Sequence, residues 1–233
     1  PGTLFEQGYD NNRLSMFINT DNTLGVQYEN SAGVVSASSV TSIAMATDSF
    51  PNQWQHVAVV RNSGTVTMYI NGISQGTASQ SSYSVGSGSD GFLNIGAGSY
   101  NNNPGSFFDG KISNFRIVRA QAIYTANFTP STNPLTTTSQ GCQPYNVVFL
   151  GCNNASDAKI ATVAVNPIVE HNGAVASEES PFSSSTADLS HTGGSVYCAN
   201  LAHNNSPTEF DTEPLTVELS GGEMDFGSGA YTI

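Results

Sequence analysis

Short hydrophobic runs separated by polar turn sequences make up the first 120 residues of this chain. The central stretch, 54–76, reads WQHVAVVRNSGTVTMYINGISQG. Residues 65–70 are rich in β-branched and aromatic side chains, and Asn71-Gly72 favours the positive φ angles of a tight hairpin turn. The pattern therefore predicts a hairpin over 57–70 and a second hairpin that begins at Ile70.

The same pattern continues on both sides of this hairpin. Further strand-like runs are 3–7, 14–18, 24–28, 34–46 and 92–96. Residues 98–105 (GSYNNNPG) are expected to form a loop, whereas 107–118 alternate cleanly between two faces of a strand. No helical period with caps occurs before residue 118, and one helical turn followed by an extended tail is expected after it. Short strands at this spacing predict an all-β sandwich or barrel.

Composition and charge narrow the range of partners. Only 10% of the 233 residues are charged, with 6 basic against 18 acidic residues. This balance leaves no basic surface for a phosphate backbone, so we expect no nucleic-acid partner. No apolar run approaches the ~20 residues that span a bilayer, so no membrane insertion is expected. Residues 141–233 carry a net charge of −10, from 1 basic and 11 acidic groups, which is most simply a solubilising acidic face.

Several motifs occur in an order that resembles a known fold. They are the Y-I-N-G turn after the tryptophan strand, then L-N-I-G-A-G, F-D-G-K-I-S-N-F-R-I-V and A-I-Y-T-A-N-F-T-P. This order is similar to the laminin-G-like domains of the concanavalin A-like lectin/glucanase class, which recur in tail and other virion proteins of bacteriophages, marine ones especially. The resemblance implies an antiparallel jelly-roll β-sandwich.

The resemblance also suggests how the chain is divided. Residues 1–136 resemble a laminin-G-like sandwich that lacks its first strands, 137–192 a linker with a strand near 146–152, and 193–233 the opening of a second repeat. A sandwich without those strands exposes unpaired backbone edges. The missing strands could come from sequence upstream of this chain, from the tail folding back on its own sandwich, or from the tail of a neighbouring subunit.

One acidic motif raises the question of catalysis. Glu209, Asp211 and Glu213 form an E-x-D-x-E sequence, as in laminarinase-type glycosidases, and a strand would place their carboxylates on one side. Pro214 follows immediately, which disfavours a central strand, and no tryptophans lie nearby to stack on sugars. We therefore expect no catalytic residues, with glycoside hydrolysis as the enzymatic alternative.

Two binding sites are considered instead. Tyr100, Asn101, Asn102 and Asn103 could contact a glycan, because an aromatic face and amide groups suit polyols, although a solvated loop has the same composition. Asp90 and Asp109 are the candidate metal ligands, since laminin-G-like domains can bind calcium at a rim with such oxygen ligands. Neither lies in a dense D-x-D-x-D sequence, so we expect no cofactor and leave calcium as an option.

Cysteines and histidines add little chemistry. Cys142 and Cys152 could form a disulfide while Cys198 stays free, but reduced thiols are the favoured reading. His56 is expected to be a half-buried sheet residue. No Cys-His or Ser-His-Asp grouping supports nucleophilic catalysis.

These observations give one functional expectation with two alternatives. The chain is expected to be a non-enzymatic structural and adhesive module of a virion, on the tail or capsid surface, which binds a host-surface glycan or packs with copies of itself or other virion subunits into a fibre. The alternatives are an extracellular bacterial surface adhesin or filament subunit, and the glycoside hydrolase described above.

Overall fold

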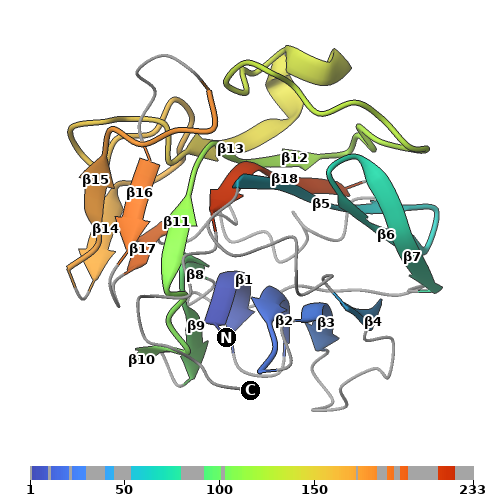
Figure 1. Cartoon of the computed structure of the whole chain (residues 1–233), viewed down its shortest axis with the longest axis horizontal. Coiled ribbons are helices and arrows are strands. Elements are labelled where there is room, and N and C mark those ends of the chain that lie inside the picture. Colours follow the sequence, from blue (N-terminus) through green and yellow to red (C-terminus); the bar gives the residue numbers. More distant parts are fainter. Residues whose placement is uncertain are drawn as a thin grey trace.

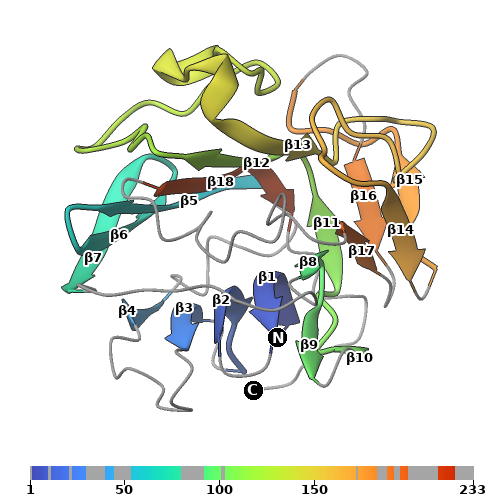
Figure 2. The same cartoon turned by 180° about the vertical axis from the view of Figure 1, so that it is seen from behind.

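Two antiparallel β-sheets face each other across a hydrophobic core in the computed structural model of this chain (Figures 1 and 2). All pairings between strands are antiparallel in the part of the chain that the structure describes, which confirms the predicted sandwich. That part is 2–9, 12–20, 23–29, 40–44, 54–79, 92–100, 103–171, 173–182, 188–191, 195–198 and 215–223.

The first sheet has the strand order β14-β17-β8-β1-β2-β3-β4. Strands β1 to β3 and β8 overlap the runs predicted at 3–7, 14–18, 24–28 and 92–96, and β4 lies within 34–46. The bounds of the seven strands are β1 (Gly2–Tyr9), β2 (Asn12–Ile18), β3 (Thr23–Glu29), β4 (Val40–Ala44), β8 (Phe92–Ile95), β14 (Ile168–His171) and β17 (Ser195–Cys198).

The second sheet has the order β15-β16-β11-β18-β5-β6-β7. One edge of β18 pairs with β5, and the other pairs with β11 and then β12, which follow each other along it. β12 also pairs with β13. The bounds are β5 (Trp54–Asn62), β6 (Thr65–Ile70), β7 (Ile73–Ser79), β11 (Gly110–Ile112), β12 (Phe115–Arg119), β13 (Val147–Gly151), β15 (Val175–Ser177), β16 (Asp188–His191) and β18 (Leu215–Glu223).

Strand alternation decides which side chains fill the core. In β5, Val57 and Val59 point into the space between the sheets, whereas Ala58 and Val60 point to the outer face of the second sheet. Every strand of β1 to β3 contributes in the same way. The largest fully buried apolar side chains are Phe5, Leu14, Met16, Leu24, Met68, Leu93, Ile95, Phe115 and Phe149.

Both predicted central hairpins form, and the second has the predicted Asn71-Gly72 turn. Ser63-Gly64 joins β5 to β6, with φ angles of 51° and 73°, and Asn71-Gly72 joins β6 to β7, with φ angles of 51° and 78°. Positive φ at both turn residues matches the right-handed twist of the flanking strands, which explains the Asn-Gly sequence.

The expectation of a plain loop over 98–105 is wrong. β9 (Gly98–Tyr100) pairs with β10 (Asn103–Gly105) in a short hairpin beside β1. The polar, glycine-rich composition indicated a turn but gave no alternation to reveal strands of three residues. The hairpin is held by main-chain hydrogen bonds, and the pattern of side chains does not reveal these bonds.

A long irregular segment, the strap (residues 120–146), crosses the outer face of the second sheet (Figures 1 and 2). Over 119–136, where one helical turn and an extended tail are expected, it forms no helix. Two single-turn 3₁₀ helices follow, η1 (Ser139–Gly141) and η2 (Pro144–Asn146). Tyr124 packs with Ala58, Val60 and Tyr69 of the sheet. The strap thereby gives the second sheet an apolar contact on both faces.

The interval expected to be a linker packs closely in its described part. Phe149 of β13 and Ile168 of β14 belong to the main core, and β13 pairs with β12. β18, from the tail, lies in the sheet of its own chain. The described residues contain no helix that is long and apolar enough to cross a membrane.

Candidate functional site

Two groups of polar residues stand out, one on the outer face of each sheet. The first is the buried charge cluster, which consists of His56, Arg116, Tyr124 and Glu218. Alternation places Arg116 and Glu218 outward because their neighbours Phe115, Ile117, Val217 and Leu219 fill the core. Arg116 and Glu218 are register partners across β12 and β18, and both are fully buried beneath the strap.

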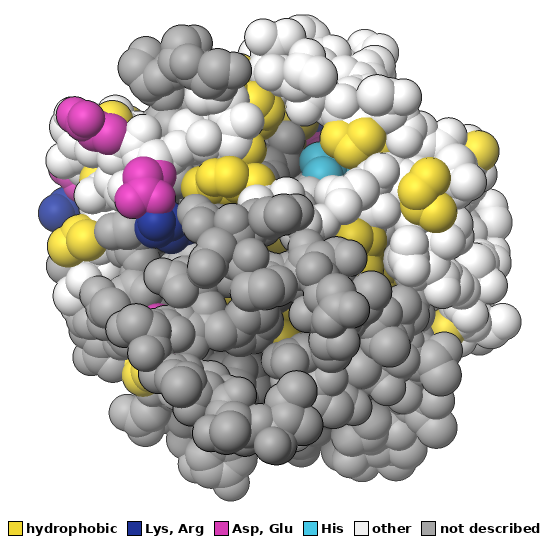
Figure 3. All heavy atoms as spheres, in the orientation of Figure 1, with side chains coloured by type: hydrophobic (Ala, Val, Ile, Leu, Met, Phe, Trp, Pro, Cys, Tyr) yellow, Lys and Arg dark blue, Asp and Glu magenta, His cyan; other side chains and the backbone are white. Residues whose placement is uncertain are grey.

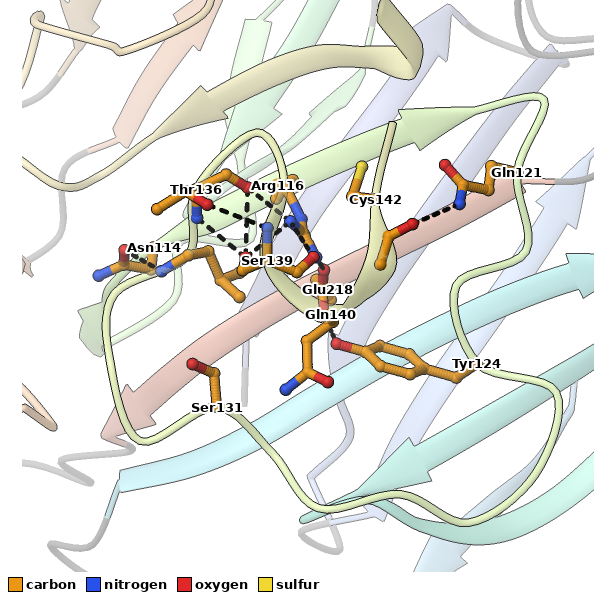
Figure 4. Close-up of polar contacts among 12 residues, drawn as sticks. Asn114, Arg116, Gln121, Tyr124, Ser131, Thr136, Ser139, Gln140, Cys142 and Glu218 are labelled. Atoms are coloured by element: carbon orange, nitrogen blue, oxygen red, sulfur yellow. Dashed lines mark hydrogen bonds and ion pairs between the residues drawn. The ribbon is translucent and has the colours of Figure 1, made fainter. Parts of the chain in front are cut away.

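Arg116 joins the sheet to the strap (Figure 4). Its Nε donates a hydrogen bond to Glu218 Oε1 at 2.6 Å, and Nη2 donates to the same oxygen. Nη1 donates to the Thr136 carbonyl oxygen at 2.6 Å and to the Ser139 carbonyl oxygen at 3.1 Å. One guanidinium therefore satisfies a carboxylate in the sheet and two backbone acceptors in the strap.

The second Glu218 oxygen faces Tyr124 and His56. The Tyr124 hydroxyl donates to Oε2, and His56 Nε2 lies 3.4 Å from the same atom. Burial opposes ionisation of Glu218, but the adjacent His56 and Arg116 outweigh it and hold the pKa of Glu218 below its usual range. Burial, together with the Glu218 charge, raises the pKa of Tyr124, so its hydroxyl stays protonated and donates.

The buried charge cluster is better suited to structure than to binding. Arg116 and Glu218 are 0% exposed, and the strap covers them, so no ligand can reach the charges without displacing it. Phe128 of the strap stacks on Tyr124 with ring centroids 3.5 Å apart and contacts His56 edge-on at 5.4 Å. These contacts close the apolar surround of the ion pair.

The ionised Glu218 predicts a characteristic loss of stability in acid. The pKa of Glu218 is lower in the folded chain than in the unfolded chain. Its contribution to the free energy of unfolding is therefore complete above the pKa in the unfolded chain, about 4.3, and is lost as the pH falls through the pKa in the folded chain. We expect the difference in urea midpoint between the native chain and Glu218→Gln to shrink from pH 7 to pH 3. A difference that stays constant over this range would show that Glu218 is not ionised in the fold.

The second group lines the outer hollow, a recess of about 560 Å³ over β1, β2 and β3. Its walls come from these strands, from Asn19 and Thr20 after β2, and from the base of the β9–β10 hairpin. The lining residues used below are Thr3, Glu6, Arg13, Ser15, Phe17, Gln27 and Gly98.

Register places polar residues side by side across this face. Asn94 pairs with Glu6, Glu6 with Ser15, and Ser15 with Gln27. They form a polar row because alternate residues of these strands point into the core. Asn94 is 3% exposed, and its Nδ2 has no hydrogen-bond partner among the described residues. Glu6, Ser15 and Gln27 of this row line the recess and present hydrogen-bond acceptors and donors to it.

An aromatic ring flanks the polar row. Phe17 is the register partner of Gly25, and a Cβ on Gly25 would lie 2.6 Å from Phe17 Cε2. The half-buried ring therefore lies across β3 in the space that a side chain at residue 25 would fill. Gly98 permits a second close approach, since its Cβ would lie 3.0 Å from Thr3 Oγ1 and 3.5 Å from Glu6 Oε2.

The charges of the outer hollow partly compensate each other. Arg13 Nη1 lies 3.7 Å from Glu6 Oε2, and the two side chains are 24% and 6% exposed. Among the described lining residues Glu6 is the one carboxylate. A site of this kind can accept and donate hydrogen bonds to several hydroxyl groups and stack one apolar face of a ligand on Phe17.

The structure places some of the residues predicted from the sequence near the outer hollow and leaves others outside its described part. Tyr100 and Asn103 are register partners in the β9–β10 hairpin, whose base lines the recess, while Asn101 and Asn102 lie outside the described residues. Asp109 is exposed between the hairpin and β11, and Asp90 lies outside the described residues. The E-x-D-x-E motif at 209–213 also lies outside them.

The described part of the chain contains no assembled site for metal binding or thiol chemistry. No group of three His, Cys, Asp or Glu residues there is placed to hold a metal ion. Cys142 and Cys152 are buried and form no disulfide with each other, and burial raises the pKa of the Cys142 thiol. His56 is buried in the charge cluster, and Trp54 is partly buried at the start of β5.

Comparison with known proteins agrees with this architecture. A family model of the concanavalin A-like lectin/glucanases superfamily, of laminin G type, matches residues 2–122, just over half of the chain. Searches among curated proteins and among solved structures each returned no match. The matched residues include β1 to β12 and therefore the whole outer hollow of the first sheet. The chain belongs to the concanavalin A-like lectin/glucanase superfamily, whose jelly-roll β-sandwich it forms.

Proposed function

We propose that this chain is a non-enzymatic, glycan-binding module that uses the outer hollow. The observation that carries the proposal is the polar row beside the Phe17 ring, in a recess of a sandwich whose superfamily includes carbohydrate-binding and adhesive modules. Hydroxyl groups of a sugar would pair with Glu6, Ser15 and Gln27. The C–H face of the sugar would lie on the Phe17 ring, whose π-face is negative.

The composition of the recess favours binding over hydrolysis. Glycoside hydrolysis generally requires two carboxyl groups, about 5 Å apart for retention or about 6.5–9.5 Å apart for inversion. Glu6 is the one carboxylate among the described lining residues, and its oxygen lies beside the Arg13 guanidinium. This arrangement offers a hydrogen-bond acceptor but no acid and nucleophile pair.

Binding to a glycan array, followed by titration of the best glycan, tests the proposal. We expect Phe17→Ala to weaken binding at least about tenfold, because loss of ring contact worth ~1.4 kcal/mol has that effect, and Glu6→Gln to weaken it similarly. Tyr145→Ala is the matched control, since Tyr145 is 78% exposed on the strap, which covers the other sheet. Equal binding by the native chain and Phe17→Ala would show that the glycan does not bind in the outer hollow.

We further propose that the module acts on a virion appendage, where it attaches to a host-surface glycan. The sequence resemblance to laminin-G-like domains of bacteriophage virion proteins supports this location. On the face drawn in Figure 3, few of the described side chains are charged. Immunogold microscopy with an antibody against residues 1–136 should label virion tails or capsids. Labelling of cells or free filaments, with bare virions, would instead support a bacterial surface adhesin.

A further inference from the structure

Strand β18 occupies a central position although it lies far beyond the residues that match the family. The matched region ends at residue 122, whereas β18 begins at Leu215. β18 separates β5 from β11 and β12, so the second sheet would be open between these strands without it. We define the strand slot as the space between β5 and β12 that β18 fills.

The strand slot recognises β18 on three sides. Residues 215–219 pair with 57–61 of β5 on one edge and with 115–119 of β12 on the other. Val217 and Leu219 are 0% and 1% exposed in the core. On the outer side, Glu218 meets Arg116, Tyr124 and His56. An extended segment with apolar residues on one face and a carboxylate on the other is thus what the slot accepts.

The chain between the two sheets allows this strand to reach another molecule. Residues 199–214 separate β17 from β18, and sixteen residues can span up to roughly 55 Å. The contacts described above join β18 to the strand slot and do not involve residues 199–214. An identical strand from a second copy would make the same contacts, and the additional cost would be the entropy lost when the two molecules associate.

We infer that β18 is an exchangeable element, and that the strand slot is an interface for a second copy of this chain, which inserts its own residues 215–223. Reciprocal insertion gives a closed dimer, and insertion in one direction gives a chain of linked sandwiches. The inference is independent of the glycan proposal, because it concerns the second sheet and not the outer hollow.

Charge reversal of the buried pair tests this inference. In Arg116→Glu the slot carries a glutamate opposite the chain's own Glu218, and in Glu218→Arg two arginines meet, so each variant disfavours its own strand. When the two variants are refolded together, the Glu218 strand of one matches the unaltered Arg116 slot of the other. We expect a 1:1 species of twice the monomer mass by light scattering and native mass spectrometry, which neither variant forms alone.

The control is the single chain that carries both reversals, Arg116→Glu with Glu218→Arg, which should remain matched within one molecule. Only monomers or precipitate from the mixed variants, under conditions in which the native chain refolds, would overturn the inference.

A second measurement avoids altering the buried charges. Val60 and Thr216 are register partners across β5 and β18. An incubated mixture of Val60→Cys and Thr216→Cys chains should yield, on mild oxidation, a disulfide between residues 60 and 216 of different molecules, identified by peptide mass. If residues 60 and 216 become linked only in the chain that carries both cysteines, exchange between copies is excluded.

Discussion

Replacement of Glu218 by glutamine is expected to lower the free energy of unfolding by about 3–5 kcal/mol, the usual cost of removing one partner from a buried ion pair. The size of glutamine is nearly the same, so the loss is electrostatic. Arg116 would remain fully buried, with its charge opposite a neutral amide. Urea denaturation of the purified chain at pH 7 measures the effect.

Two further variants show whether the stability lost in Glu218→Gln comes from the buried, unpaired charge of Arg116. The double change Arg116→Met with Glu218→Leu removes both charges, and it should be less destabilising than Glu218→Gln alone. Glu179→Gln removes a carboxylate that is 59% exposed and pairs with Lys111, so it should change stability by less than about 1 kcal/mol. A loss for Glu218→Gln as small as that for Glu179→Gln would mean that the pair does not hold the strap.

Strand positions were predictable because they depend on local alternation. The runs at 14–18 and 65–70 show β-rich composition between turn residues, and the structure forms β2 and β6 there. The Asn71-Gly72 turn followed from backbone sterics alone. The order of motifs supplied the sandwich class, which the family match confirms.

The two polar groups could not be predicted, because their members meet only through the sheet register. Glu6, Ser15 and Gln27 come from three strands, and each is unremarkable within its own run. Arg116 and Glu218 are 102 residues apart. The usable indication was the outward place of Arg116 in an alternating strand, where a cation needs a partner if it is covered. Composition pointed instead to the Tyr100 loop, which is polar but short and local.

The outer faces of the two sheets differ in how they are covered. The strap and the buried charge cluster cover the outer face of the second sheet, so this face contributes to stability and positions β18. The first sheet keeps a recess lined by polar residues and an aromatic ring. A glycan bound in this recess, as proposed, would contact strands whose side chains are positioned by the sheet register.

Substitution of Gly72 by alanine is expected to destabilise the chain by about 2–4 kcal/mol, as the sum of a left-handed backbone and an overpacked contact. Gly72 has φ of 78°, and its added Cβ would collide with the Phe128 carbonyl oxygen and lie 3.0 Å from Pro130 Cδ. The Phe128 N–H donates to the Gly72 carbonyl oxygen at 2.9 Å, so the strap is docked directly on this turn. Urea denaturation measures the loss, and hydrogen exchange at the Phe128 amide reports release of the strap.

Gly173→Ala separates the two causes. Gly173 has nearly the same φ, 77°, but its added Cβ would meet no described atom within 4 Å, so only the backbone cost of about 1–2 kcal/mol applies. Gly72→Ala should therefore exceed Gly173→Ala in cost, and it alone should accelerate exchange at Phe128. Equal costs and an unchanged Phe128 amide would show that the strap does not rest on the β6–β7 turn, because a strap fixed there has no room for a methyl group.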